Sequence, residues 1–483
     1  MRTISVSAVL AGLAFISWGC VAGGPARSAR ARNEAASAVA MERGRPISGV
    51  HAPRSPLDTR EKGLPVLDDT ATLQDYLVYA ALNNPGLEAA FDRWQAALES
   101  VPQVRALPDP RFTYAYFIRE VETRVGPQQH KFRIAQMFPW FGKLELRGNA
   151  AGEEAEAARQ RYEAQKVRLF YEVKEAYYEY YYLGRAIAVV RDQLRFVTYL
   201  EGVVRTRYRA AAAKYADVIR AQVELGKLDD QLRSLQDLRE PVVAGINAAL
   251  NRPIWAELPW PAEVAEAKVD ATDEQIFLWL EESSPELKEL DHWTAKAGIG
   301  IDLARKNFYP DVTFGLDYIQ TGGPIMSTPD AGKDPVIAMV SINVPLWYGK
   351  LRAAVREAEA RQRASANSRT NLENVLSARV KLALYKWRDA ERKIDLYRDT
   401  LLPKARQSLR AYETAFMAGT ATFLDVVDAI RVLLHFELSY ERALADHAKS
   451  LAGVEKLIGR ELPRAGPTDG PGSSTAPIDG PIE

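Results

Sequence analysis

The chain has 483 residues, and its 63 basic and 63 acidic side chains give a formal net charge of zero. This balance excludes the global positive field by which many proteins attract nucleic acid. Hydrophobic residues make up 47% of the chain, but no internal run of 18 or more apolar residues occurs, so the interior of the sequence predicts no conventional membrane-spanning helix.

The N-terminus predicts an export signal over residues 1–20. A basic residue precedes an apolar run at 4–18 that is too short for a membrane helix. Cys20 follows this run directly, as the acylated cysteine of a bacterial lipoprotein does, and we predict Cys20 as the lipidated mature N-terminus. Cleavage after Ala22, which would discard Cys20, is the alternative. As the only cysteine, Cys20 cannot form a disulfide within one chain.

Residues 21–69 are rich in small residues, arginine and proline and show no apolar period, which predicts an extended N-terminal arm. A first structural repeat is predicted over 70–260. After helical sequence, period-two alternation predicts strands at about 111–119 and 130–138. Long helices follow over about 144–250. Their first tract has no proline, and some 65 helical residues would reach ~95 Å.

A second structural repeat is predicted over 261–460, in the same order. Its strands are expected at about 311–320 and 336–344, and its long helices at about 351–459. The last residues, 461–483, are mostly proline, glycine, serine and aspartate, which predicts a flexible C-terminal tail.

Matching segments of the two repeats support a duplication. The offset between them grows only from 200 to 208 residues along the chain. The matching pairs are Asn84-Pro85-Gly86-Leu87 with Ser284-Pro285-Glu286-Leu287, Phe141-Gly142-Lys143-Leu144 with Tyr348-Gly349-Lys350-Leu351, and Tyr215-Ala216-Asp217-Val218-Ile219 with Phe423-Leu424-Asp425-Val426-Val427. Such a repeat indicates one body built from two similar halves rather than several independent domains.

Four strands per chain are too few to close a barrel, yet a sheet facing lipid cannot leave its edges unpaired. Two copies would give eight strands, whose interior side chains fill, whereas three copies would give twelve strands and an open passage. We therefore predict a trimer with a 12-stranded membrane β-barrel, whose long helices would form a second cylinder of packed helical pairs on one side of it. Aromatic residues at the strand ends suit a membrane interface, although a soluble α+β protein could carry them too.

The chain resembles the TolC-like outer-membrane efflux factor family over roughly residues 70–460. The motifs that carry the resemblance are Asn84-Pro85-x-Leu87, Tyr309-Pro310-Asp311, Val344-Pro345-Leu346 and the stretch from Gly419 to Ala429, and the segment from Gln136 to Leu144 is most similar to the heavy-metal efflux branch. The resemblance implies a homotrimeric exit duct whose 12-stranded β-barrel spans the outer membrane and whose 12-helix α-barrel crosses the periplasm. Its implied partners are a periplasmic adaptor and an inner-membrane transporter, for which we expect a proton-driven pump.

Site residues follow from the same resemblance. Asp425 and Asp428 match aspartates that ring the closed periplasmic entrance, and Asp217 matches a related position. Three residues apart, Asp425 and Asp428 share a helix face, and three copies would favour cations at a narrow axis. The alternative is helix capping, because Thr422-x-x-Asp425 is also a capping-box pattern. The expected adaptor-contacting tips are Gly419, Thr420 and Ala421 in one hairpin and Ala211 and Ala212 in the other.

No motif predicts an enzyme or a cofactor. The histidines have no metal-ligand spacing, and His435 and His447 are expected on helix surfaces. The tyrosines at 177–182 are expected to pack between helices rather than to stack on bases, since no basic groove accompanies them. The alternatives to an efflux duct for metal cations or drugs are a type I secretion duct for peptides or proteins and a structural coiled-coil protein of the envelope.

Overall fold

The computed structural model describes residues 63–261, 269–323, 329 and 332–464. The predicted signal with Cys20, most of the predicted arm and most of the predicted tail lie outside the described residues. The described chain is mainly helical with one small sheet, which confirms the predicted fold class.

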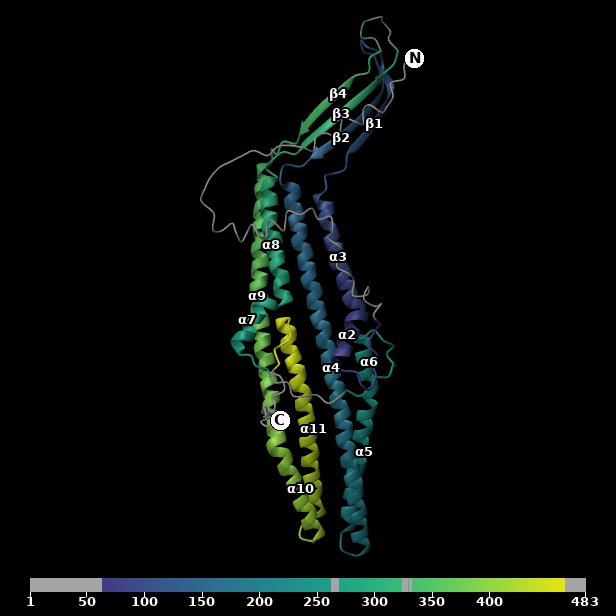
Figure 1. Ribbon diagram of the computed structural model, residues 1–483, viewed down its shortest axis with the longest axis vertical. Helices are drawn as coiled ribbons and strands as arrows, with labels where there is room; N and C mark the ends of the chain where they lie inside the picture. Colours follow the sequence, from purple (N-terminus) through teal and green to yellow (C-terminus); the bar gives the residue numbers. More distant parts are fainter. Residues whose placement is uncertain (1–62, 262–268, 324–328, 330–331, 465–483) are drawn as a thin grey trace, which may run out of the picture. The chain divides into compact units, whose positions relative to one another are not determined.

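The two halves of the chain repeat one order of elements (Figure 1). The first half consists of α2 (Leu73–Asn83), α3 (Pro85–Arg105), β1 (Arg111–Val121), β2 (Gln128–Phe138), α4 (Lys143–Arg209), α5 (Tyr215–Asp237) and α6 (Arg239–Ala249). The second half consists of α7 (Asp273–Ser283), α8 (Pro285–Lys306), β3 (Val312–Thr321), β4 (Val336–Ile342), α9 (Tyr348–Asp395), the π-helical η4 (Leu396–Leu401), α10 (Leu402–Met417) and α11 (Phe423–Ile458). This repeated order confirms the predicted helix–hairpin–long-helix duplication.

Prolines divide two stretches for which the sequence predicts single helices. The return helix of the first half breaks at Leu238, between α5 and α6. Pro241 has no N–H to donate to the carbonyl four residues earlier, so the helix ends there and restarts. In the second half, the π-helical η4 lies directly before α10, whose second residue is Pro403. A wider π turn accommodates the same missing hydrogen bond without ending the helix.

The long helices lie side by side in one layer (Figure 1). Next to the sheet, α4 lies between α3 and α8, and α8 lies between α4 and α9 (Figure 1). Further along α4, its neighbours are α5 and α11, and α11 packs in turn on α9 and α10. One side of the layer is therefore formed by α3 and α5 and the other by α9 and α10.

The sheet has the strand order β1-β2-β3-β4 with every pair antiparallel. The central pairing joins the two halves, with Arg133 opposite Asp317 and Phe138 opposite Val312. Within the described residues β1 and β4 each pair on one side only, so both leave an edge of unpaired backbone groups.

Two apolar cores hold the helices together. The larger lies among α2, the start of α3, α4, α5, α6, α10 and α11, and the smaller among α7, α8, α9 and the end of α11. Four of the clustered tyrosines are buried, which confirms their predicted packing role: Tyr177, Tyr178, Tyr180 and Tyr181. The prediction for His447 is wrong. This side chain is only 3% exposed and accepts a 2.8 Å hydrogen bond from Trp387 Nε1, because its face of α11 packs on α9.

Ion pairs join α4 to α11 along their shared length. Lys174 Nζ lies 2.7 Å from Glu455 Oε2, and both side chains are buried. Glu179 receives hydrogen bonds from Arg442 and Lys449. Buried charges need such partners, because removing one member of a buried ion pair destabilises the folded protein by about 3–5 kcal/mol. These pairs fix how the two helices lie against each other.

Candidate functional site

The turns at the two helical hairpin tips have the same backbone geometry. Gly419 has φ +77° and Ala211 has φ +56°, so both adopt the left-handed conformation after a helix. Thr420 N–H bonds the Ala415 carbonyl at 2.8 Å, and Ala212 N–H bonds the Arg207 carbonyl at 2.7 Å. These are Schellman turns, in which a left-handed residue lets the chain reverse. Ala211 adopts this conformation although its Cβ makes it less favourable than glycine.

Asp425 lies in the first turn of α11 and caps that helix. Its Oδ2 accepts hydrogen bonds from Thr422 N–H at 2.8 Å and Thr422 Oγ1 at 2.7 Å, while Asp425 N–H bonds Thr422 Oγ1 at 3.3 Å. The hydrogen bond from the Thr422 hydroxyl and, to a smaller extent, the one from the Thr422 N–H lower the pKa of Asp425. The carboxylate therefore stays charged at neutral pH, which both the capping role and a gate role require.

The other two predicted gate aspartates are held less firmly. Asp428 is 61% exposed and receives one 3.4 Å hydrogen bond from Arg431. Asp217 occupies the first turn of α5, with its side chain 16% exposed, and receives a 3.3 Å hydrogen bond from Arg220. Among the described residues, no hydrogen bond or ion pair joins Asp217 to Asp425 or Asp428. The structure thus places Asp425 and Asp428 on α11 and Asp217 on α5, each within the first two turns after a hairpin tip.

Two side chains that sequence reasoning missed connect the hairpins near their tips. Arg431 of α11 donates to both carboxylate oxygens of Glu224 on α5, at 2.6 and 3.1 Å, and Glu224 is buried. We call this pair the tip clasp. Arg207, near the end of α4, donates to the Phe416 carbonyl at 2.6 Å and lies over the Phe416 ring at 4.7 Å. A charged side chain three residues after Asp428 was the only sequence signal of the clasp.

The sheet has one apolar and one polar face. The register places these apolar or aromatic side chains on one face, together with His130, Gln136 and Gln320: Phe112, Tyr114, Tyr116, Phe132, Ile134, Phe138, Val312, Phe314, Leu316, Tyr318, Val336, Ala338, Val340 and Ile342. Most of the large ones are exposed, among them Phe112 at 67% and Val340 at 65%. So large an exposed apolar area is unusual for a surface in water and suits contact with lipid.

Lys143 and Asp311 fasten the sheet to the helices. Lys143 Nζ, on the first residue of α4, lies 2.7 Å from Asp311 Oδ1 and donates to the Tyr309 carbonyl at 3.2 Å. Trp140 N–H donates to the same carboxylate oxygen at 2.8 Å, and the Trp140 ring stacks on Tyr309. The repeated motifs of the two halves thus meet at this junction. Phe141, Trp347 and Tyr348 are exposed around it.

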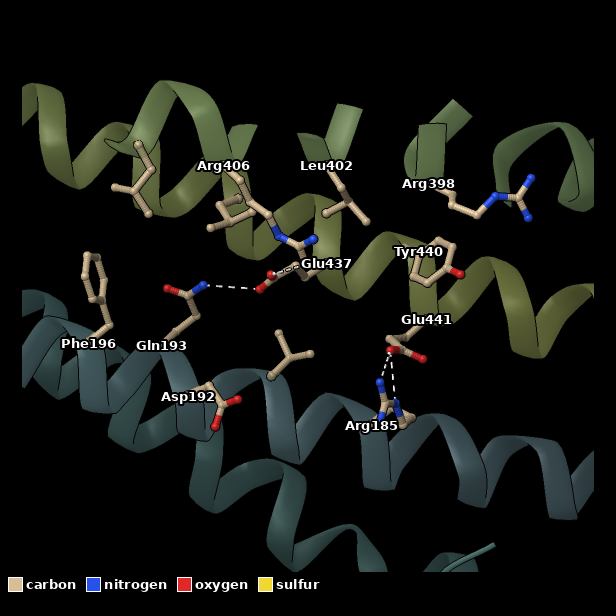
Figure 2. Close-up of a pocket in the computed structure, with 13 residues that line it drawn as sticks. Arg185, Asp192, Gln193, Phe196, Arg398, Leu402, Arg406, Glu437, Tyr440 and Glu441 are labelled. Carbon is tan, nitrogen blue, oxygen red and sulfur yellow. Dashed lines mark hydrogen bonds and ion pairs between the residues drawn. The ribbon is translucent and has the colours of Figure 1, made fainter. Parts of the chain in front are cut away.

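A cavity of about 590 Å³ lies where α4, η4, α10 and α11 meet (Figure 2). Arg185 pairs with Glu441, while Glu437 accepts hydrogen bonds from Gln193 at 3.2 Å and from Arg406 at 3.3 Å. The Gln193 amide oxygen is buried and makes no hydrogen bond within the described residues. The charged groups at this cavity are mostly engaged with one another, which is typical of a structural contact between helices.

Within the described ranges, no group of three or more histidine, cysteine, aspartate or glutamate side chains could hold a metal ion. The helices there also include none that is long and apolar enough to cross a membrane.

Comparison with solved structures identifies the class of protein to which this fold belongs. The chain is similar to the outer membrane protein VceC of Vibrio cholerae, with a TM-score of 0.67 and 17% identity over 80% of this chain and 96% of VceC. It is similar to CusC, with a TM-score of 0.69 and 16% identity over 80% of this chain and 92% of CusC. The fold is that of the TolC-like outer-membrane channels.

The amino-acid sequence identifies the family. Residues 77–252 and 280–460 match the outer membrane efflux protein family, and the chain belongs to it. The cobalt-zinc-cadmium resistance protein CzcC of Cupriavidus metallidurans is 24% identical over 430 residues, which cover 83% of this chain and 94% of CzcC. The resemblance noted from the sequence motifs is confirmed.

Proposed function

We propose that three copies of this chain form the exit duct of a tripartite efflux system. The observation that carries the proposal is the pair of unpaired sheet edges beside an exposed apolar face. Backbone groups at such edges must be satisfied where water is absent, and β4 of one copy can pair with β1 of the next. Three four-stranded sheets then give a closed barrel of about twelve strands with an open interior.

The helix layer supports the same assembly. Its two sides, α3 with α5 and α9 with α10, differ from each other, so contact between copies is head-to-tail and closes into a ring. Both sides expose large apolar residues. On α5 they are Tyr215, Ile219 and Val223, four residues apart on one face, and on α9 and α10 they include Leu382, Tyr385 and Tyr412. Each stripe would be covered by a neighbouring copy.

For the periplasmic end we propose a gate formed by Asp425, Asp428 and Asp217. In a trimer, the first two would contribute six carboxylates near the axis, where they repel one another and attract cations. Capping and gating are compatible, because the Asp425 carboxylate that accepts from Thr422 is charged and lies at the tip. We propose the turns at Ala211–Ala212 and Gly419–Ala421 as the adaptor-contacting surface.

The proposed partners are a periplasmic adaptor and an inner-membrane, proton-driven transporter. Because CzcC is a cobalt-zinc-cadmium resistance protein, its likeness favours metal cations among the cargoes of the system, with drugs as the other class. A type I secretion duct is the alternative, since the same passage would also serve exported peptides.

The test combines fractionation with single-channel recording. We expect the full-length protein in the outer-membrane fraction, as a trimer that dissociates on heating, and ion channels when the purified trimer enters a planar bilayer. As a matched edge variant, Val340→Pro removes a backbone donor from β4. We expect Val340→Pro to abolish the trimer and the conservative control Leu382→Met to retain it. A monomer that remains in the aqueous fraction would refute the duct.

A further inference from the structure

All charged side chains in the regularly paired part of the sheet lie on one face. They are Arg111, Lys131, Arg133 and Asp317, and the strand register places each of them opposite to the apolar face. Small residues such as Ala135 and Gly315 lie between them and leave room above the sheet. Three positive charges and one negative charge give this polar face a formal charge of +2 per chain.

Asp317 is enclosed by its two basic neighbours. Its side chain is 2% exposed and accepts hydrogen bonds from Arg133 Nε at 2.6 Å and Arg133 Nη2 at 2.8 Å, while Lys131 Nζ lies 2.8 Å away. The basic groups are more accessible, with Lys131 28% and Arg133 38% exposed. The negative charge is therefore shielded, and the charge presented by this face is positive.

We infer that this polar face forms a positively charged belt inside the outer-membrane segment of the duct, which favours anionic solutes over free cations. The inference rests on the proposed duct, because only closure of the sheet turns the polar face into a lumen. Three copies would carry a formal charge of +6 there. The belt consists of Arg111, Lys131, Arg133 and Asp317 in each copy.

The belt is opposite in sign to the proposed gate at the far end of the helices. α4 alone has 67 residues, so at 1.5 Å per residue about 100 Å separates the two charged regions. This distance is some ten Debye lengths at 0.1 M salt, and the two fields act independently. At the tip, the local field would attract a cationic cargo and repel an anionic one. At the belt, the field would repel the cationic cargo and attract the anionic one.

Charged thiol reagents can measure this field directly. Ala135→Cys places a thiol beside the belt, and the matched Ala338→Cys places one on the apolar face. Full-length trimers in lipid bilayers would be treated with anionic or cationic methanethiosulfonates, with rates normalised to a small thiol in solution. The unsubstituted chain, which retains Cys20, gives the background.

At Ala135→Cys the anionic reagent should react about tenfold faster than the cationic one at 0.1 M salt, since charged clefts concentrate counter-ions by such factors. At 1 M salt the ratio should approach one, because the Debye length falls to about 3 Å. Lys131→Gln leaves the Arg133–Asp317 pair intact and should lower the ratio at least about twofold. The control Lys404→Gln, exposed on α10, should leave it unchanged. Ala338→Cys should resist both reagents.

The outcomes separate this inference from the proposed function. If Ala135→Cys reacts with neither reagent, the polar face does not line water, and the duct itself is refuted. If it reacts with both at equal normalised rates, or faster with the cationic reagent, the duct stands and the anion-favouring belt is refuted. A ratio that Lys131→Gln does not lower would also refute the assignment of the field to these residues.

Discussion

Breaking the tip clasp should loosen the hairpin tips without unfolding the helices. Arg431→Met removes the charged fork from α11 but retains much of its apolar stem. Glu224, with a side chain 9% exposed, would then keep Lys227 at 3.8 Å as its one ion-pair partner in the part of the chain that the structure describes. An uncompensated buried carboxylate is unfavourable, so the closed contact between α5 and α11 would lose stability.

The magnitude follows from the contact geometry. One hydrogen bond to a charged group contributes about 1.5–3 kcal/mol when shielded from water, and we take this range for the whole two-bond contact. Arg431 is 47% exposed, which reduces this contribution to about 1–2 kcal/mol by solvent screening. Since about 1.4 kcal/mol corresponds to a tenfold change in an equilibrium constant, local opening of the tips should become roughly tenfold more frequent.

Amide hydrogen exchange on the full-length trimer can measure this opening, because local exchange reports local stability. The first turns of α5 and α11 should exchange about tenfold faster in Arg431→Met, while the α4 segment at Lys174 keeps its protection. Arg220→Met is the matched control, since within the described residues Arg220 bonds Asp217, three positions earlier on the same helix, at 3.3 Å and does not bridge to α11. Equal protection in Arg431→Met and the unsubstituted protein would show that the clasp does not hold the tips.

Three further predictions concern the same region. Gly419→Ala should destabilise the turn at Gly419 by about 1 kcal/mol, and Ala211→Gly should stabilise the turn at Ala211 by less than that. Hydrogen exchange at the tips measures both changes, and changes of the opposite sign would contradict the strain argument. Replacing Asp425 and Asp428 together by alanine should raise single-channel conductance and weaken block by divalent cations, and unchanged conductance and block would remove them from the gate. Arg431 lowers the pKa of Glu224 from its ordinary 4.5, so the clasp contributes fully above that pH and is lost as the pH falls through the lower, folded-state pKa. After correction for the intrinsic pH dependence of amide exchange, the protection of the tip amides should therefore fall below about pH 4.5. Glu224→Gln should remove this contribution and leave the one from the Asp425 cap, whose pKa is lowered from 3.8.

Repetition and periodicity made much of the fold predictable from the sequence. Alternation of apolar residues with a period of two marked the hairpins, because a sheet with lipid on one face requires it at every strand. Long stretches without proline marked α4 and most of α9. The family resemblance rested on motifs at element junctions, such as Tyr309-Pro310-Asp311, where Asp311 binds Lys143 across the two repeats.

Contacts between distant segments were not predictable in the same way. The clasp joins residues 207 positions apart, and neither Glu224 nor Arg431 stands out from other charged helix residues. His447 was misplaced because helical periodicity does not tell which of two polar-looking faces meets another helix. The turn at Ala211 was expected from its match to Gly419, but its left-handed conformation was not, since alanine rarely adopts it and only the surrounding hydrogen bonds impose it.

The different edges at β1 and β4 have a genetic consequence in the proposed ring. Each subunit must pair through β1 with one neighbour and through β4 with the other, so one defective copy prevents the ring from closing even when the other two copies are intact. With equal synthesis of normal and β4-defective chains and random mixing, only about one trimer in eight would contain normal chains alone. A β4-edge allele should therefore be dominant over the normal gene, whereas a deletion of the whole gene should be recessive.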